Sequence, residues 1–315
     1  MALPSTPLSS VPLQSAPIPF PLDAHLHTDL SPDAIVPVDA YAALAREYGM
    51  PEICITDHLD FDPGDPAFAF TAFEERERTV REAAERWGES PAIRLGVEIT
   101  YEQRLEADIR EHLRRHRYDY TIGSVHPSLR NPMRSPEDAA RWCAGKTHRE
   151  ASAWYWDEVE AAIRSGLFDT IGHLDFVKRY MHAALGPFEF EPHADVFDRL
   201  LTALVETGTA LEVNSSGLRQ EPAEAYPGPL VVERFRQLGG ELVIAGSDAH
   251  RIESFGFGLR EAYRSIAASG FRWLSFRRGE GRVAVEMSRE IVARVTETGS
   301  GEIVTYGPGA DLGPG

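Results

Sequence analysis

Cysteine and long apolar runs are scarce in this chain of 315 residues. The two cysteines, Cys54 and Cys143, are far apart and match neither a zinc-ligand nor a redox spacing. No disulfide framework is therefore expected, and this cysteine usage fits a reducing, cytoplasmic location. No apolar stretch reaches the roughly 18–20 residues that cross a bilayer, so no membrane association is expected. The first 20 residues contain no lysine or arginine, which argues against a signal peptide.

Positive charge is also in short supply. The chain has 32 lysines and arginines against 49 aspartates and glutamates, and its formal net charge is −17. Proteins that bind nucleic acid attract the phosphate backbone with clustered basic residues, so a nucleic-acid partner is not expected. Two nucleotide-binding signatures are missing as well, because neither GxGxxG nor GxxxxGK(S/T) follows the first apolar run.

Short apolar runs alternate with longer charged segments along the chain. Seven runs have the length and the Ile, Val, Leu and Tyr content of strands, at 20–26, 52–56, 93–99, 118–125, 169–174, 210–213 and 241–245. Five of the segments between them read as helices, at 37–45, 72–87, 151–163, 195–206 and 231–238. Repeated strand–helix units predict a parallel α/β sheet with helices outside. Without a glycine-rich phosphate loop, a closed barrel is favoured over an open sheet.

No internal linker divides the chain, so a single domain is predicted at residues 21–287. Residues 1–20 are rich in Pro, Ser and Leu and are expected to form a flexible N-terminal extension. Residues 288–315 lack helical periodicity and become rich in glycine, so a partly flexible C-terminal tail is expected there.

Polar residues able to bind metal follow the predicted strands. Six of the 11 histidines lie at strand ends: His25, His27, His58, His126, His173 and His250. In a parallel barrel the carboxyl ends of the strands converge on one face, where active sites lie. His25 and His27 are two positions apart on a strand and point to the same side, which suits a shared metal ion.

The remaining five histidines are predicted to have no metal role. His112 and His116 are four residues apart on a predicted helix, but arginines surround them and no glutamate follows His112 as in HExxH. A solvated basic face is expected there. His148, His182 and His193 are expected at the surface.

The strand-end motifs are His25-x-His27, Thr56-Asp57-His58, Gly96-Val97-Glu98, Gly123-Ser124-Val125-His126, Gly172-His173-Leu174-Asp175 and Gly246-Ser247-Asp248-Ala249-His250. In order and spacing they resemble the PHP family of metal-dependent phosphoesterases and, within it, the monofunctional histidinol-phosphatases. The resemblance to the phosphatases depends on two further segments, Ser165-Gly166-Leu167-Phe168-Asp169 and Asn214-Ser215-Ser216-Gly217-Leu218-Arg219.

The resemblance implies a distorted TIM-like (β/α)7 barrel that holds three divalent metal ions. The implied ligands are His25, His27, Glu98 and Asp248 for the first ion, Glu98, His126 and His173 for the second, and Asp33, His58 and His250 for the third. Glu98 would bridge the first two ions, and Asp33 stands where some relatives have histidine. Imidazole and carboxylate ligands suit Zn, Mn or Fe, and the sequence does not choose among these metals.

The implied reaction is hydrolysis of a small-molecule phosphate monoester, L-histidinol phosphate, to L-histidinol and phosphate. No serine or cysteine nucleophile is required, because metal ions lower the pKa of bound water and neutralise phosphoryl oxygens. The expected step is direct attack by hydroxide held on the metal ions, with Glu98, Asp248 and His250 at the catalytic centre. Asp175 is expected to orient His173 or to donate a proton.

Further polar residues are expected at the mouth of the barrel. Arg179 and Arg219 follow strands that end there, and arginine binds phosphate oxygens with paired hydrogen bonds. Lys178 is the alternative phosphate ligand, and Asp57 is expected to orient a metal ligand. Acceptors for the ammonium group of histidinol are expected among Asp60, Tyr101 and Glu102.

Two alternatives remain open at this point. Other PHP phosphoesterases act on nucleoside bisphosphates or degrade nucleic acid, and the acidic composition argues against a nuclease. Some PHP domains are non-catalytic modules, but here all nine implied ligand positions hold a residue that can bind metal. The sequence does not indicate an oligomeric state.

Overall fold

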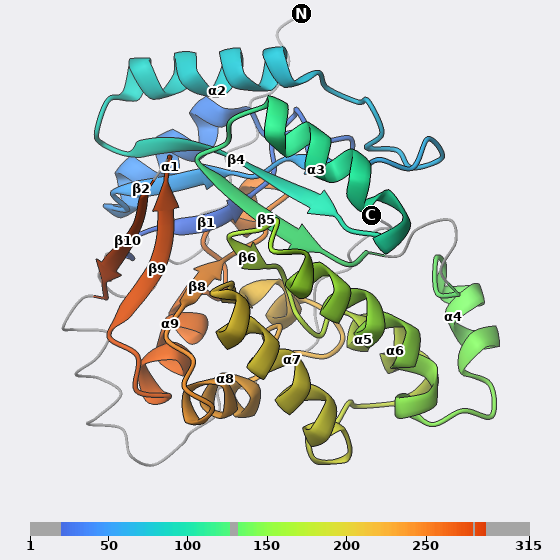
Figure 1. The fold of residues 1–315 in the computed structure, drawn as a ribbon. Coiled ribbons are helices and arrows are strands. Elements are labelled where there is room, and N and C mark those ends of the chain that lie inside the picture. Colours follow the sequence, from blue (N-terminus) through green and yellow to red (C-terminus); the bar gives the residue numbers. More distant parts are fainter. Residues whose placement is uncertain (1–19, 127–131, 280, 288–315) are drawn as a thin grey trace, which may run out of the picture.

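The main feature of the fold is a parallel sheet rolled into a barrel (Figure 1). The computed structural model describes residues 20–126, 132–279 and 281–287, so the predicted extension before Phe20 and the tail 288–315 lie outside the described residues. The strand order is β1-β2-β4-β5-β6-β7-β8, and the short strand β3 pairs with β4. The pairings along this path are parallel. The predicted α/β barrel is therefore confirmed, with β3 as an additional strand.

The barrel strands are short and, apart from β3, buried along their length. They are β1 Asp23–Leu26, β2 Glu52–Ile55, β3 His58–Leu59, β4 Ala92–Thr100, β5 Tyr120–Ser124, β6 Thr170–Ile171, β7 Ala210–Asn214 and β8 Val243–Gly246. The barrel interior covers one face of each strand and the helices cover the other. Strands that are buried on both faces appear in the sequence as apolar runs, which explains why these runs predict the positions of the barrel strands.

Backbone hydrogen bonds between the ends of β1 and β8 close the barrel. The Asp248 amide donates to the His25 carbonyl at 2.8 Å, and the His27 amide donates to the Ala249 carbonyl at 3.0 Å. Leu26 and Ala249 also form a parallel bridge. The closure therefore places His25, His27 and Asp248 beside one another.

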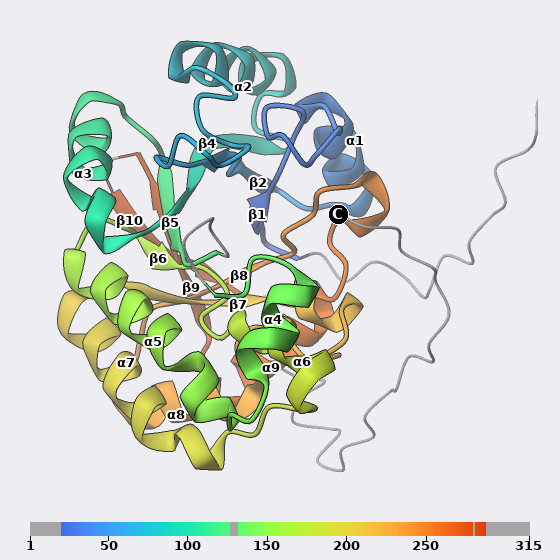
Figure 2. The same ribbon diagram turned by 90° about the vertical axis from the view of Figure 1, so that its right-hand side faces the viewer.

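Helices surround the strands, as Figure 2 shows. They are α1 Val38–Tyr48, α2 Phe73–Trp87, α3 Glu106–Arg115, α4 Pro136–Cys143, α5 His148–Ser165, α6 Val177–Leu185, α7 Ala194–Thr207, α8 Pro229–Gln237 and α9 Leu259–Ala268. Local signals set their ends, as α5 illustrates. Thr147 and Glu150 form a capping box at its start, and Gly166, with φ of 64°, ends it in the left-handed conformation.

An antiparallel hairpin that the apolar runs do not predict follows the barrel. It consists of β9 Trp273–Arg278 and β10 Gly281–Glu286. Arg278 forms an ion pair with Glu52 at the start of β2, and Arg277 forms one with Asp169, just before β6, at 3.3 Å. Since both acids lie at the amino ends of barrel strands, the hairpin lies at the amino end of the barrel.

Both cysteines are buried and unpaired, Cys54 on β2 and Cys143 on α4. Cys54 belongs to the hydrophobic core of the barrel. In the part of the chain that the structure describes, no helix combines the length and the apolar character needed to cross a membrane.

Candidate metal centre

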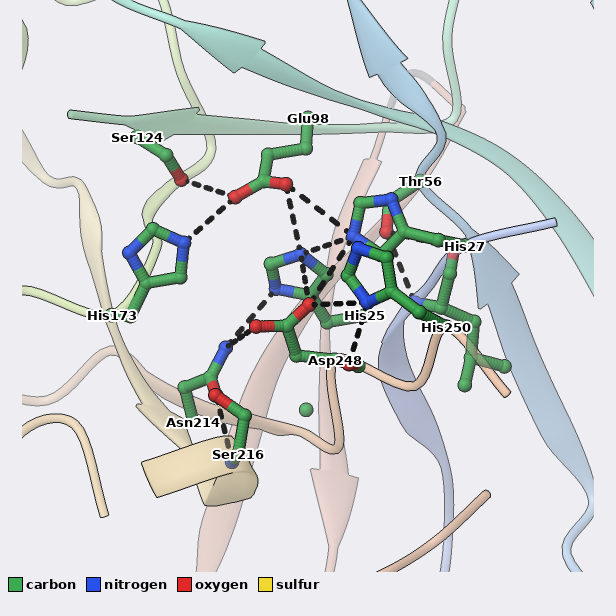
Figure 3. A network of polar contacts seen from close by, with 12 residues as sticks. His25, His27, Thr56, Glu98, Ser124, His173, Asn214, Ser216, Asp248 and His250 are labelled. Carbon is green, nitrogen blue, oxygen red and sulfur yellow. Dashed lines mark hydrogen bonds and ion pairs between the residues drawn. The ribbon is translucent and has the colours of Figure 1, made fainter. Parts of the chain in front are cut away.

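Imidazole and carboxylate groups converge at the carboxyl end of the barrel (Figure 3). They come from the ends of β1, β3, β4, β5, β6 and β8 and from the loop after β1. The structure brings together all nine residues that the resemblance implied as ligands: His25, His27, Asp33, His58, Glu98, His126, His173, Asp248 and His250. Their ligand atoms fall into the three implied groups, which lie in contact with one another: His58 Nδ1 is 3.0 Å from Glu98 Oε2, and His250 Nδ1 is 3.5 Å from Asp248 Oδ1.

The first group is the most deeply buried. His25 Nε2 and His27 Nε2 lie 3.3 and 3.4 Å from Glu98 Oε2, and 3.7 and 3.4 Å from Asp248 Oδ1. The two imidazole nitrogens are 3.0 Å apart. The side chains of His25, His27 and Glu98 have 0% exposure. Four ligand atoms around one enclosed point suit a four-coordinate ion.

Glu98 reaches the second group with its other oxygen. His173 Nε2 and His126 Nε2 lie 2.9 and 3.3 Å from Glu98 Oε1, and 3.1 Å from each other. Ser124 Oγ donates to the same oxygen at 2.6 Å. Because Oε2 faces the first group and Oε1 the second, the geometry allows Glu98 to bridge two ions.

The third group opens to solvent. Asp33 Oδ2 lies 3.3 Å from His58 Nε2 and 3.2 Å from His250 Nε2, and these two nitrogens are 3.5 Å apart. The Asp33 and His250 side chains are 48% and 26% exposed. A substrate can therefore approach the cluster from the side of this group.

The carboxylates of the cluster remain ionised despite their burial. Burial disfavours the charged form of Glu98, but the surrounding histidines, His25 foremost, hold its pKa well below the ordinary value. At Asp248 the field of His25 likewise outweighs burial and lowers the pKa. Burial is also outweighed at Asp33, where hydrogen bonds from two imidazoles lower the pKa. The cluster is thus an anionic centre surrounded by histidines. Although burial opposes the shift, the neighbouring carboxylates raise the pKa of His25 and His58, and cation binding would displace the protons of these two rings.

The donor set fits divalent cations. Imidazole nitrogens of His25, His27 and His58 lie within 3.0–3.4 Å of Glu98 Oε2. None of the described residues satisfies this buried oxygen with a hydrogen bond. An unsatisfied buried carboxylate oxygen is costly, and a cation among these atoms would remove that cost. Imidazole and carboxylate groups are suitable ligands for Zn, Mn and Fe.

Contacts on the far side of the rings aim the Nε2 atoms at the cluster. His25 Nδ1 lies 2.7 Å from Glu212 Oε1, and His126 Nδ1 lies 2.9 Å from Thr100 Oγ1. The other Glu212 oxygen accepts from the His173 amide at 2.7 Å. A hydrogen-bond partner on Nδ1 fixes the ring and leaves Nε2 for a metal ion.

Glu212 is the residue at this site whose role the sequence does not reveal directly. It lies in the middle of β7, is 1% exposed and links His25 to His173. An acidic residue inside the apolar run 210–213 is a usable signal, because a fully buried glutamate is rarely without a partner. Its partners are visible only in the fold.

Replacing Glu212 with glutamine is expected to lower metal affinity and activity by roughly 10–100-fold. Glutamine preserves the size but turns one acceptor oxygen into a donor, which would then face a donor of His25 or His173. Metal titration of the depleted protein, followed by phosphate-release assays, measures both effects. The exposed Glu47→Gln substitution on α1 is the matched control and should change neither. Unaltered metal affinity in Glu212→Gln would contradict the orienting role.

Two members of the cluster have a strained backbone. His173 has φ of 24° and Asp248 has φ of 54°, conformations that residues other than glycine rarely adopt. Such strain is typical of functional sites and persists only where surrounding contacts maintain it. Gly246 allows the close approach of β1 and β8, because a Cβ at this position would lie 2.3 Å from the Cβ of His25.

Arg219, at the end of the short helix η3 (Ser215–Arg219), contacts the backbone of the loop after β8. Its Nη1 donates to the Ser247 carbonyl at 2.8 Å, and its Nη2 donates to the Asp248 carbonyl at 2.6 Å. Arg219 therefore holds the loop that carries a candidate ligand. The phosphate contact expected of this arginine stays a prediction.

Lys178 and Arg179 are neighbours in sequence but differ in their surroundings. The buried Lys178 Nζ donates to Asp175 at 3.0 Å, to Glu224 at 2.8 Å and to a backbone carbonyl at 2.9 Å. These acceptors occupy all of its protons. Burial raises the pKa of Asp175 to about 6 although Lys178 opposes the shift. The Arg179 guanidinium lies 5.5 Å from the ring centroid of Phe176, and among the described residues no acceptor contacts it.

The residues expected to accept the substrate ammonium group have different environments. Asp60 is buried, and one of its oxygens has no hydrogen-bond partner among the described residues. Burial, together with a hydrogen bond to Asp65, raises the pKa of Asp60 to about 7. The Tyr101 hydroxyl donates to Glu106 at 2.8 Å, and Glu102 accepts from an arginine at 2.8 Å. Asp60 thus has a buried carboxyl oxygen without a hydrogen-bond partner among the described residues.

Two histidines outside the cluster differ from their predicted surface positions. His112 contacts the Tyr118 hydroxyl through Nε2 at 2.9 Å, packs near Phe73, and has its pKa lowered to about 4 by burial. His193 is buried and stacks on Phe188. The expected solvated position is therefore wrong for His112 and His193. Phe73 comes from α2, a segment that the local sequence pattern around His112 does not show, whereas Tyr118 and Phe188 are close in sequence to their histidines.

The fold and the cluster together define a class of protein: an α/β barrel with a histidine- and carboxylate-lined centre at the carboxyl ends of its strands. The PHP domain family matches residues 23–216, which is more than half of the chain. The chain belongs to the PHP domain family.

Several curated relatives match over nearly their whole length. A probable histidinol-phosphatase of Deinococcus radiodurans is 33% identical over 261 residues, which cover 81% of this chain and 96% of the relative. A probable histidinol-phosphatase of Thermotoga maritima is 28% identical, with 81% and 94% covered. The histidinol-phosphatase of Lactococcus lactis is 25% identical, with 81% and 93% covered.

A solved structure shares the fold. It is the histidinol phosphate phosphatase of Lactococcus lactis complexed with zinc, L-histidinol and phosphate. The TM-score is 0.73 at 24% sequence identity, and the match covers 83% of this chain and 98% of the other.

Proposed function

We propose that this protein is a metal-dependent phosphatase that hydrolyses L-histidinol phosphate to L-histidinol and phosphate, a step of histidine biosynthesis in the cytoplasm. The observation that carries the proposal is the cluster of three ligand groups, two of which share Glu98. The relatives named as histidinol-phosphatases support the substrate, because this chain covers more than 90% of their length.

We propose three divalent ions, one for each ligand group. The zinc bound by the Lactococcus lactis protein makes zinc the first candidate, with Mn and Fe as alternatives. Bound divalent ions would lower the pKa of water and neutralise charge on the phosphoryl oxygens. The residues of the chain fix the geometry: Glu98 sets two groups at once, and Glu212 and Thr100 orient the imidazoles.

The substrate would enter from the solvent-facing third group and meet residues with free hydrogen-bonding atoms. Arg179 has available donors for two phosphoryl oxygens. Asp60 has a free acceptor oxygen for the ammonium group of histidinol. When the ester P–O bond breaks, the leaving oxygen takes up a proton, and we assign its delivery to Asp175.

The two arginines at the mouth should respond differently to alanine substitution. Arg179→Ala is expected to lower kcat/KM by on the order of ten- to a hundredfold, because a charged hydrogen bond to phosphate is lost. Metal content should not change. Arg219→Ala is expected to lower metal content as well, because the loop that carries Asp248 loses two hydrogen bonds.

Kinetics and metal analysis of both variants test this difference. The exposed Arg264→Ala substitution on α9 is the control for the loss of a surface charge. Normal kinetics in Arg179→Ala would exclude it from phosphate binding. If Arg219→Ala keeps its full metal content but has a raised KM, the phosphate contact is assigned to Arg219 instead.

A phosphate-release assay tests the proposed substrate. L-histidinol phosphate is compared with a nucleoside bisphosphate, with Zn and Mn added separately to the depleted protein. The proposal predicts the higher kcat/KM for L-histidinol phosphate. A preference for the bisphosphate would assign another PHP phosphoesterase activity, and bound metal without turnover of either ester would indicate a non-catalytic module.

A further inference from the structure

A cavity of about 630 Å³ lies at the end of the barrel opposite the metal centre. It is bordered by the end of α8, the start of β8 and the β9–β10 hairpin, with Arg236, Glu241, Phe271, Arg272, Trp273 and Arg282 among its lining residues. Leu242 lines this cavity just before β8, and Asp248 in the cluster follows the other end of β8, so one small ligand cannot occupy both places. The proposed phosphatase reaction uses none of these residues.

The cavity carries an excess of positive charge although the chain has a net charge of −17. Three guanidinium groups and one carboxylate line it. Among the described residues no acceptor contacts the Arg272 side chain, and Arg236 donates only to the Gly240 carbonyl, at 3.0 Å. Arg282 donates to Ser275 Oγ at 3.0 Å and to two backbone carbonyls, and its guanidinium lies 3.9 Å from the Asp169 carboxylate. Since arginine has five N–H donors, each of the three keeps donors for a ligand.

Aromatic rings adjoin these cations. Trp273 is 49% exposed, which is a large apolar area to leave in water. Phe271 also lines the cavity, and the Arg236 guanidinium lies 5.3 Å from its ring centroid. Rings beside guanidinium groups can bind a flat ligand ring by stacking while the arginines bind its charge.

We propose that this cavity binds an anion that carries a flat ring, an aromatic or heteroaromatic carboxylate or phosphate, at a site separate from the metal centre. The guanidinium groups bind the anionic group through paired hydrogen bonds, and the ring stacks on the exposed Trp273. The volume falls within the roughly 300–1,000 Å³ typical of small-molecule sites.

Binding of naphthalene-1-sulfonate to the full-length, metal-loaded protein tests the proposal by isothermal titration calorimetry. A sulfonate presents an anion and a ring but is a weak metal ligand. Arg272→Glu should weaken binding by about tenfold or more, because a like charge replaces an opposite one. Arg264→Glu, an exposed charge reversal on α9, should leave the affinity unchanged. The neutral analogue 1-naphthalenemethanol should bind at least about tenfold more weakly than the sulfonate.

Arg272 is exposed, and its side chain forms no hydrogen bond or ion pair with the described residues, so its substitution should leave the fold intact. Unchanged kcat/KM for the proposed substrate, or an unchanged thermal unfolding midpoint if that substrate is not turned over, verifies the fold. Absence of binding at millimolar sulfonate, or equal affinity in Arg272→Glu and the parent protein, would overturn the proposal. Neither result depends on the phosphatase assignment.

Discussion

Exhaustive chelation is expected to abolish phosphate release, and a single added divalent metal is expected to restore it. The reason is the donor set, in which nine imidazole and carboxylate residues lie in three groups with ligand atoms 2.9–3.7 Å apart. Uncatalysed hydrolysis of phosphate monoesters is among the slowest of biological reactions, so loss of the metal ions removes the main source of rate enhancement. The measurement is phosphate release before chelation, after chelation, and after addition of Zn or Mn.

Two controls make this result decisive. Metal analysis of the chelated sample must show that the ions are gone, and circular dichroism must show that the barrel remains folded. Full turnover by folded protein without metal would contradict the proposal that phosphate release depends on metal ions. Lost turnover that no divalent metal restores would show instead that chelation damaged the protein.

Glu98→Gln is expected to reduce activity more than loss of any other single cluster residue. One oxygen of Glu98 faces the first ligand group and the other faces the second, so an amide disturbs both. The loss should exceed the roughly 10–100-fold that removing a ligand-orienting residue costs. Metal stoichiometry should fall together with turnover, because an amide nitrogen does not replace a carboxylate oxygen as a ligand.

The comparison variants for this prediction are Asp33→Asn at the exposed third group and Glu47→Gln on α1. Asp33→Asn also exchanges a carboxylate for an amide but affects one group only, so it should be milder. Glu47→Gln should have no effect. Near-normal turnover and metal content in Glu98→Gln would show that this carboxylate does not bridge.

The barrel can be predicted from the sequence because its strands are buried on both faces and appear as apolar runs. The hairpin cannot be recognised in this way, since β9 and β10 contain exposed arginines and are only partly buried. Strand β3 contains two residues and exists only through its pairing with β4. Pairing of that kind depends on segments that are distant in sequence.

Eight of the nine candidate ligands are recognisable because each stands near a strand end, in a motif that the sequence displays; Asp33 lies in the loop after β1. Their supporting contacts are not recognisable. Glu212 and His25 are 187 positions apart, so the bond that fixes the His25 ring requires the closed barrel. The basic side chains at the mouth of the barrel are likewise only partly predictable. The sequence gives the position of Lys178, but the acceptors that bind its protons become visible only in the fold.

Anomalous diffraction from crystals of the zinc-loaded protein tests the central claim most directly. We predict three zinc peaks at the carboxyl end of the barrel, each about 2.0–2.2 Å from the nitrogen and oxygen atoms of its own ligand group. Glu98 should contact two of the ions, one with each carboxylate oxygen. Zinc bound only elsewhere on the protein, with no peak among the nine cluster residues, would contradict the account.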